Sequence, residues 1–353
     1  MISFKPISKK DLLILDDGYS NIKFDDISYE LINFKKINFF CLIKTIYNFI
    51  FQTKRLSFKQ KYKQTLYRMF SPSVIISHHI NKRGVECKIL CPEIKVAIYQ
   101  FAYCPEKFNL NHILGNFKNE KNKILFDYLF VYHEEDKISF NNETKVFITG
   151  SIKNNEIMIL NNKKQKNSLL YISEFDTKNS KDHYYYKNEK YLIGILADFC
   201  KKKNLKLNVA LRSNRKDKKI DRKKEIDFFN ENLGNNYSVS DLDSYTFASQ
   251  NELVVCLSSN LGIELISRKY KVIFILLNDS KIERYPYLPA DDLFVHRNND
   301  KGQIISKLEK IYEVSEQSWM NFLSLNFKNL KFDPGNKIFK TEIKKIINYE
   351  KNI

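Results

Sequence analysis

Short apolar runs alternate with longer helical patterns along the first half of the chain. Apolar runs bounded by turn residues are typical of strands buried on both faces of a sheet. They lie at residues 11–18, 71–79, 95–103, 128–136 and 145–151, with a helical pattern over 35–70 between the first two. Strands separated by helices predict a parallel sheet covered by helices on both faces.

The same pattern restarts in the second half. Apolar runs at 169–176, 205–213, 252–259, 271–277 and 290–297 alternate with helical patterns that include 188–204 and 223–234. Between the two series lies the polar segment 152–168, which is rich in Asn and Lys and predicts a linker.

The sequence therefore predicts an α/β protein with two Rossmann-like, doubly wound domains that face a central cleft. We expect an N-terminal, acceptor-side domain over 1–151, a linker over 152–168, a C-terminal domain over 169–330, and a helix or tail over 331–353. A length of 353 residues suits about two domains of ordinary size.

The net charge of +18 changes the range of possible partners. A basic protein favours nucleic acids, anionic membranes or phosphorylated substrates. A non-enzymatic, nucleic-acid-binding protein is one interpretation. However, the lysines are spread along the chain and no RRM, helix-turn-helix or KH pattern occurs, so we expect no nucleic-acid partner.

The most apolar stretch, "INFFCLIKTIYNFIF" at 37–51, allows two interpretations. It contains Lys44 and is too short to span a bilayer. We favour an ordinary buried helix, and the alternative is a surface that contacts anionic lipid. The N-terminus has no long apolar region or cleavage site typical of a signal peptide.

Several familiar motifs are absent. No GxGxxG or GxxxxGK[ST] motif occurs, which argues against dinucleotide binding of the usual kind and P-loop hydrolysis. The six cysteines form no CxxC pair, so we expect buried free thiols and no metal site.

Polar residues gather at the ends of several predicted strands. They are Asp16 and Asp17, His78 and His79, Arg212, and Ser258 with Ser259. Acids and imidazoles suit a base that deprotonates an acceptor hydroxyl, whereas arginine and helix-start amides suit a leaving phosphate. This division favours group transfer from a phosphate-activated donor.

Each of these residues also has a structural interpretation. The aspartates form an Asx turn before Gly18, or a serine caps the helix that follows. Arg212 pairs with Glu225 or Asp227. Glu264 reaches a ribose hydroxyl, or it bonds a neighbouring helix start.

The segments "VFITGS", "LLYISEFD", "VALRS", "ELVVCLSSNLGIELISRKYKVIFI" and "VSEQSWMNFL" occur in this order. Their combination resembles the GT-B glycosyltransferases of surface carbohydrate biosynthesis, the proteins of lipopolysaccharide and capsule loci. The resemblance covers residues 70–325 and consists of an ordered set of weak motifs.

The resemblance implies roles for particular residues. In that family, the segment matching Ser258, Ser259, Gly262 and Glu264 contributes to the nucleotide-sugar site, and here Asn260 lies within it. The serine pair is also similar to the serine motif of bacterial sialyltransferases, which contacts the donor phosphate.

The segment "LDDG" looks like the acidic motif of those same enzymes, which implies that Asp17, ahead of Asp16, is the general base. This motif lies on the first strand, and no His-Pro dipeptide exists. The segment "SHHIN" stands where relatives often have Asp-Asn, which implies acceptor-side roles for His79 and Asn81.

The resemblance implies a glycosyltransferase with a CMP-, UDP- or GDP-linked sugar donor, no obligatory metal, and a glycan or lipid-linked acceptor. It implies a cytoplasmic protein, peripheral at the inner membrane face. The alternative is a polyol-phosphate transferase that uses CDP-glycerol or CDP-ribitol, in which His78, His79 and His296 supply base and phosphate ligands.

Overall fold

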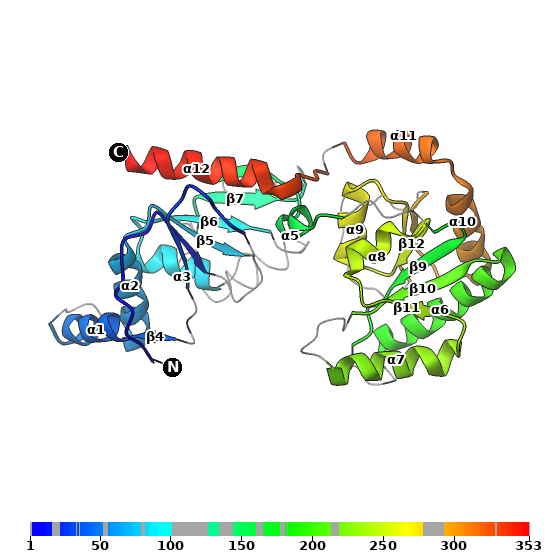
Figure 1. The fold of residues 1–353 in the computed structure, drawn as a ribbon, viewed down its shortest axis with the longest axis horizontal. Coiled ribbons are helices and arrows are strands. Elements are labelled where there is room, and N and C mark those ends of the chain that lie inside the picture. Colours follow the sequence, from blue (N-terminus) through cyan, green and yellow to red (C-terminus); the bar gives the residue numbers. More distant parts are fainter. Residues whose placement is uncertain are drawn as a thin grey trace. The chain divides into compact units, whose positions relative to one another are not determined.

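The computed structural model divides the chain into two compact α/β units (Figure 1). Unit 1 comprises residues 1–156 and 329–353, and unit 2 comprises 157–328. The structure describes residues 2–15, 22–32, 34, 36–51, 56–78, 82–100, 126–133, 144–159, 165–176, 181, 183–212, 219–277, 293–328 and 330–352.

A six-stranded parallel sheet forms the centre of unit 1, in the order β3-β2-β5-β6-β7-β8. The strands are β2 (Leu12–Leu15), β3 (Tyr29–Leu31), β5 (Val74–His78), β6 (Lys95–Tyr99), β7 (Tyr128–Val131) and β8 (Lys145–Ile148). The chain leaves β2 towards β3 on one side and continues from β5 to β8 on the other. The strand order therefore reverses between β2 and β5, and such switch points are where doubly wound sheets bind ligands.

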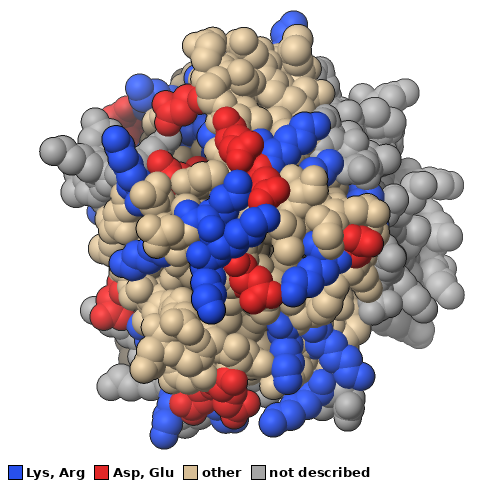
Figure 2. All heavy atoms as spheres, turned by 90° about the vertical axis from the view of Figure 1, so that its right-hand side faces the viewer, with Lys and Arg blue, Asp and Glu red and all other residues tan. Residues whose placement is uncertain are grey.

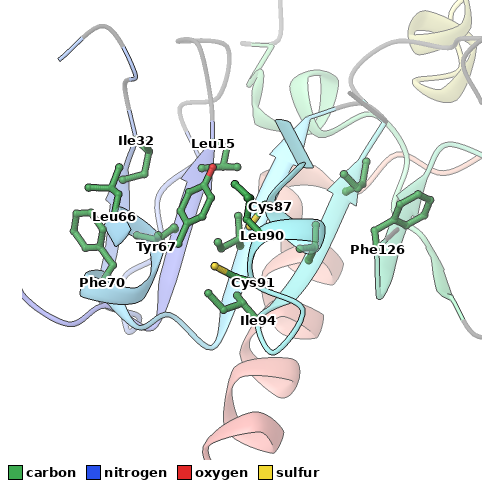
Figure 3. Close-up of a cluster of buried hydrophobic side chains, with 14 of the residues drawn as sticks. Leu15, Ile32, Leu66, Tyr67, Phe70, Cys87, Leu90, Cys91, Ile94 and Phe126 are labelled. Atoms are coloured by element: carbon green, nitrogen blue, oxygen red, sulfur yellow. The ribbon is translucent and has the colours of Figure 1, made fainter. Parts of the chain in front are cut away.

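Helices cover both faces of this sheet because successive side chains of each strand point to opposite faces. Leu13 and Leu15 pack with α2 (Phe58–Phe70) and α3 (Lys82–Leu90), through residues such as Tyr67 and Cys87 (Figure 3). Leu12 and Ile14 pack on the other face against α12 (Lys337–Lys351). The segment expected as a C-terminal helix or tail is thus part of the core of unit 1.

Buried amides hold this returning segment in place. The Asn155 side chain donates to the Asn336 Oδ1 (3.0 Å) and the Thr149 carbonyl (2.9 Å), and its Oδ1 accepts from the Asp333 amide (2.9 Å). Asn155 lies in the short helix α5 (Ile152–Glu156), so the first part of the expected linker is packed helix. Close by, Gly150 has φ +72°, and a Cβ there would lie 2.2 Å from the Lys331 carbonyl oxygen.

The helix α1 (Phe39–Phe51) contradicts the expectation of a buried helix. It packs against α2 at the periphery of unit 1 (Figure 1), and of its residues only Cys41 and Thr45 are buried. The two short strands β1 (Ile2–Ser3) and β4 (Ile37–Asn38) pair beside it. Among the described helices, none has both the length and the apolar character needed to cross a bilayer.

Unit 2 also contains a six-stranded parallel sheet, in the order β11-β10-β9-β12-β13-β14. The strands are β9 (Ser168–Ile172), β10 (Lys206–Ala210), β11 (Ser238–Val239), β12 (Leu253–Cys256), β13 (Val272–Ile275) and β14 (Val295–His296). The helices are α6 (Tyr184–Lys203), α7 (Lys219–Leu233), α8 (Ser244–Ser249), α9 (Asn260–Ser267), α10 (Lys301–Glu313) and α11 (Glu316–Asn326). The order reverses between β9 and β12, which places the second switch point there.

We expect Asn155→Ala to lower the free energy of unfolding of unit 1 by about 3 kcal/mol, because it leaves several buried hydrogen-bonding groups without the Asn155 partner. Thermal unfolding followed by circular dichroism measures this. Asn326→Ala is the matched control, since Asn326 is exposed and its side chain bonds the Phe322 carbonyl within the same helix. Equal melting temperatures for the two variants would contradict a role of Asn155 in holding α12.

Candidate functional site

The polar residues predicted at the switch point of unit 1 are only partly described. Asp16, Asp17 and His79 lie outside the described residues. Leu15, the last residue of β2, pairs with Ser77 of β5, so the carboxyl ends of these two strands are neighbours. His78 is half-buried, with its ring 6.3 Å from that of Tyr99. The acceptor-side roles of these residues remain predictions.

At the switch point of unit 2, a carboxylate is bound just before α9, at the residue that precedes the N-cap of this helix. The register pairs Ile172 of β9 with Cys256 of β12, so the residues that follow these strands are adjacent. The Ser258 amide donates to Glu174 Oε1, and the Ser258 hydroxyl donates to Glu174 Oε2 over 2.8 Å. Amides and the helix dipole at a helix start favour a negative charge, and here Glu174 of the same chain supplies it.

The two serines have different structural roles. Ser259 is the N-cap of α9: its backbone is extended (φ −70°, ψ 133°) and its Oγ accepts from the Leu261 amide at 3.3 Å. Ser258 contacts the carboxylate instead. Asn260 is the first residue of α9 and is half-buried beside them. Capping and anion binding, which were alternative interpretations of this segment, are therefore divided between Ser259 and Ser258.

Arg212 extends from the end of β10 towards the end of β9. Its Nη1 donates to the Glu174 carbonyl over 3.0 Å and lies 3.4 Å from Asp176 Oδ2. Its amide donates to Glu225 Oε1 over 2.8 Å. The side chain is 54% exposed, so the guanidinium retains surface for a further anion beside the carboxylate that Ser258 binds.

Two more glutamates lie behind Glu174. Ser173 Oγ is 2.9 Å from Glu189 Oε1 on α6 and 2.6 Å from Glu225 Oε1 on α7. One hydroxyl hydrogen serves one acceptor, so a proton on one carboxyl satisfies the second contact. In the described part of the chain, no group of three or more His, Cys, Asp or Glu side chains is arranged to hold a metal ion.

Glu189 has a raised pKa and therefore favours the protonated form. Burial raises the pKa of Glu189 to about 8, the Ser173 hydroxyl partly opposes the rise, and the charges of Glu174 and Glu225 add to it. A neutral Glu189 allows three glutamates to lie near one strand end. Sequence reasoning missed Glu174. This residue comes shortly after β9, just as Arg212 comes shortly after β10 and Ser258 shortly after β12. Glu189 lies on a helix and gives no local signal, whereas the sequence suggests Glu225 only as a partner of Arg212, whose amide does donate to it.

Gly262 and Glu264 have structural partners in this structure. A Cβ at Gly262 would lie 2.6 Å from Phe274 Cζ and 2.7 Å from Cys256 Sγ, so this glycine lets α9 approach the sheet closely. The Glu264 carboxylate accepts from the Tyr245 hydroxyl over 2.5 Å and the residue is 5% exposed. That contact joins α8 to α9. A ribose contact by Glu264 remains a prediction.

The chain contains two doubly wound α/β units, and solved structures of similar fold assign it to the GT-B fold. The UDP-GlcNAc 2-epimerase of Neisseria meningitidis has a TM-score of 0.60 at 13% identity, covering 95% of this chain and 99% of that one. The wall teichoic acid polymerase TagF has a TM-score of 0.52 at 11% identity, covering 98% and 91%. The pneumococcal O-GlcNAc transferase GtfA has a TM-score of 0.50 at 11% identity, covering 84% and 62%.

A family model described as "putative O-antigen biosynthesis protein" matches residues 106–347, more than half of the chain. The chain therefore belongs to this family of O-antigen biosynthesis proteins. No curated protein matches it. The expected GT-B architecture and the resemblance to surface carbohydrate biosynthesis proteins are confirmed.

Because the folded protein keeps a proton on Glu189 that the unfolded chain releases above its ordinary pKa of 4.5, stability falls as pH rises from about 4.5 to about 8. One proton corresponds to a slope of about 1.4 kcal/mol per pH unit. We expect Glu189→Gln to remove this contribution. Trp319, the only tryptophan and buried in unit 2, reports unfolding in urea by its fluorescence.

The matched control for this measurement is Glu231→Gln, which changes an exposed glutamate on α7. We expect it to keep the pH dependence of the unmodified protein. A Glu189→Gln variant that also keeps this pH dependence would show that Glu189 is ionised in the folded state.

We expect Gly262→Ala to destabilise unit 2 by about 1–3 kcal/mol, because the new methyl group overlaps Phe274 and Cys256. Gly194→Ala is the control. Gly194 lies within α6, and a Cβ added there would have no atom within 4 Å, so alanine should stabilise by about 0.5–1 kcal/mol. The Trp319 fluorescence midpoint in urea measures both, and a Gly262→Ala midpoint at or above that of the unmodified protein contradicts the packing role.

Proposed function

We propose that this protein is a glycosyltransferase of surface polysaccharide synthesis. It moves a sugar from a nucleotide-sugar donor to a glycan or lipid-linked acceptor. The observation that carries the proposal is the binding of a carboxylate by Ser258 at the start of α9, at the switch point of unit 2. A position that binds a carboxylate through an amide and a hydroxyl is chemically suited to a phosphate.

In this proposal, the donor phosphate exchanges with the Glu174 carboxylate. Glu174 is half-buried, so its side chain can leave Ser258 without opening the core. Arg212 then lies beside the position vacated and contributes positive charge to the leaving phosphate. Once displaced, the carboxylate is free to accept hydrogen bonds from sugar or ribose hydroxyls.

The acceptor side rests on the sequence resemblance. Asp17, with Asp16 as the second choice, removes the proton of the acceptor hydroxyl as its oxygen attacks the anomeric carbon. The bond from that carbon to the phosphate oxygen breaks, and the nucleotide leaves with the electron pair. His79 and His78 orient the acceptor. We place this reaction in the cytoplasm, at the inner face of a membrane that carries the acceptor.

A polyol-phosphate transferase is the second candidate. The proteins with a similar fold include an epimerase bound to UDP-GlcNAc, GtfA in complex with UDP and GlcNAc, and TagF soaked with CDPG. These ligands make uridine and cytidine diphosphates the first nucleotides to test. A donor whose alcohol moves together with its phosphate, releasing CMP, would support the second candidate.

We expect one of CMP, CDP, UDP and GDP to raise the melting temperature of the purified protein, because a ligand that binds the folded state stabilises it. Arg212→Ala and Ser259→Ala should reduce this shift, the first by loss of charge and the second by loosening the helix start. Glu174→Ala should increase it, because the phosphate no longer competes with a carboxylate for Ser258.

Arg222→Ala is the matched control, since Arg222 pairs with Asp241 through a contact outside this cluster. It should keep the shift of the unmodified protein. Release of the nucleotide from its sugar, dependent on an acceptor, then tests transfer itself. Absence of a shift with any nucleotide, or an equal response of Glu174→Ala and Arg212→Ala, would contradict the donor site.

A further inference from the structure

The helix α1 turns its small and polar side chains towards the protein and its large apolar side chains towards solvent. Its inward residues are Cys41 and Thr45, and the Asn48 side chain donates to Thr65 Oγ1 of α2 over 3.4 Å. Its outward residues are large and apolar. This outward surface, the α1 apolar face, consists of Phe40, Ile43, Ile46, Tyr47, Phe49, Ile50 and Phe51.

These side chains are exposed to an unusual degree. Tyr47, Ile50 and Phe51 are 63%, 67% and 68% exposed. Neighbouring residues extend the surface: Phe58, 41% exposed, lies with its ring 5.6 Å from that of Phe49. Single exposed apolar residues are ordinary, but a set of this kind on one helix marks a surface that binds a membrane or another protein.

The charge around this face indicates which kind of partner it binds. Residues 31–85 contain no Asp or Glu, and they contain eight lysines and three arginines. Part of this charge is compensated, because Lys63 and Arg68 pair with glutamates that follow the segment. Lys36, Lys44 and Lys59 are exposed close to α1 in the sequence. On the face of the molecule in Figure 2, by contrast, acidic and basic side chains are interspersed. The exposed charges that adjoin α1 in the sequence are therefore all positive.

An apolar helix face beside a segment that is basic and lacks acidic residues complements the surface of an anionic bilayer, which offers acyl chains beneath phosphate groups. The 13 residues of α1 extend for about 20 Å, less than the ~30 Å of a hydrocarbon core, so the helix fits the plane of the interface. A second copy of this chain is a poorer partner, because a symmetric contact brings the lysines of both copies together.

We propose that the α1 apolar face docks the protein onto an anionic phospholipid bilayer. The helix lies in the interface with Ile46 and Ile50 among the acyl chains, and Lys44 and Lys59 contact the headgroups. This inference goes beyond the transferase proposal and does not depend on it, since docking requires no nucleotide.

Sedimentation with sucrose-loaded vesicles tests the proposal. We expect binding to phosphatidylcholine vesicles that contain 30% phosphatidylglycerol (about a third anionic lipid, enough for electrostatic attraction) and at least about tenfold weaker binding to pure phosphatidylcholine. Ile46→Ser/Ile50→Ser should weaken binding to the anionic vesicles at least about tenfold. Leu325→Ser is the control, because Leu325 is 82% exposed on α11 of unit 2.

A second pair of variants tests the charge. Lys44→Gln/Lys59→Gln should weaken binding to anionic vesicles severalfold and leave binding to neutral vesicles unchanged. Lys201→Gln/Lys310→Gln removes the same charge from exposed positions on α6 and α10, and should have a smaller effect. Equal effects of the two pairs would overturn the assignment of the lysines next to α1.

Unfolding cannot account for the expected loss, because the substituted residues are exposed and their variants should melt within a few degrees of the unmodified protein. Size-exclusion chromatography with light scattering measures the oligomeric state and so tests the alternative that α1 binds a second copy of the chain. A dimer that Ile46→Ser/Ile50→Ser converts to a monomer, without vesicle binding by either protein, would overturn the proposal in favour of a second copy. Failure to bind vesicles leaves the donor-site test with nucleotides unaffected, so the two proposals fail separately.

Discussion

The contact between Glu174 and Ser258 links the segments that follow β9 and β12, the two strands between which the strand order of unit 2 reverses. Strand order reverses between β9 and β12, so the residues after these strands are adjacent in space although they are far apart in sequence. The start of α9 presents an amide and a hydroxyl there, and the helix dipole favours a negative charge at this point. A carboxylate from the neighbouring strand end satisfies all of these requirements. The same requirements would be satisfied by a phosphate, which links the stability of the site to its proposed function.

That contact has consequences for the groups behind it. An ionised Glu174 disfavours charge on Glu189, whose carboxyl approaches Ser173 from one side while Glu225 approaches it from α7. Burial raises the pKa of Glu189 to about 8, which leaves it neutral near pH 7 and limits the repulsion. Replacement of Glu174 by a phosphate would keep a negative charge at the helix start. The protonated state of Glu189 is therefore compatible with both occupants, and the hydrogen bonds around Ser173 need not rearrange.

Much of the fold was predictable because it rests on local patterns. Apolar runs such as 253–256 and 272–275 lie at the positions expected for strands buried on both faces, and Ser258 and Arg212 lie at strand ends as predicted. The site itself depends on contacts between distant residues. Glu174 meets Ser258 across 84 positions, and Glu225 meets Ser173 across 52, so no local pattern could reveal these pairs. The packing of α12 on unit 1 was hidden for the same reason.

The helix α1 shows a different limit of sequence patterns. Its composition predicts burial, because a helix that is apolar on most sides usually lies in a core. Periodicity does not reveal which side faces the protein, however, and here the small or polar residues Cys41 and Asn48 bond to α2, while the buried Thr45 bonds the Cys41 carbonyl within α1. Those contacts are specific: a hydroxyl, an amide and a thiol fix the rotation of the helix about its axis. The larger side chains are consequently held outward, which is the arrangement that a bilayer-facing surface requires and that a core helix avoids.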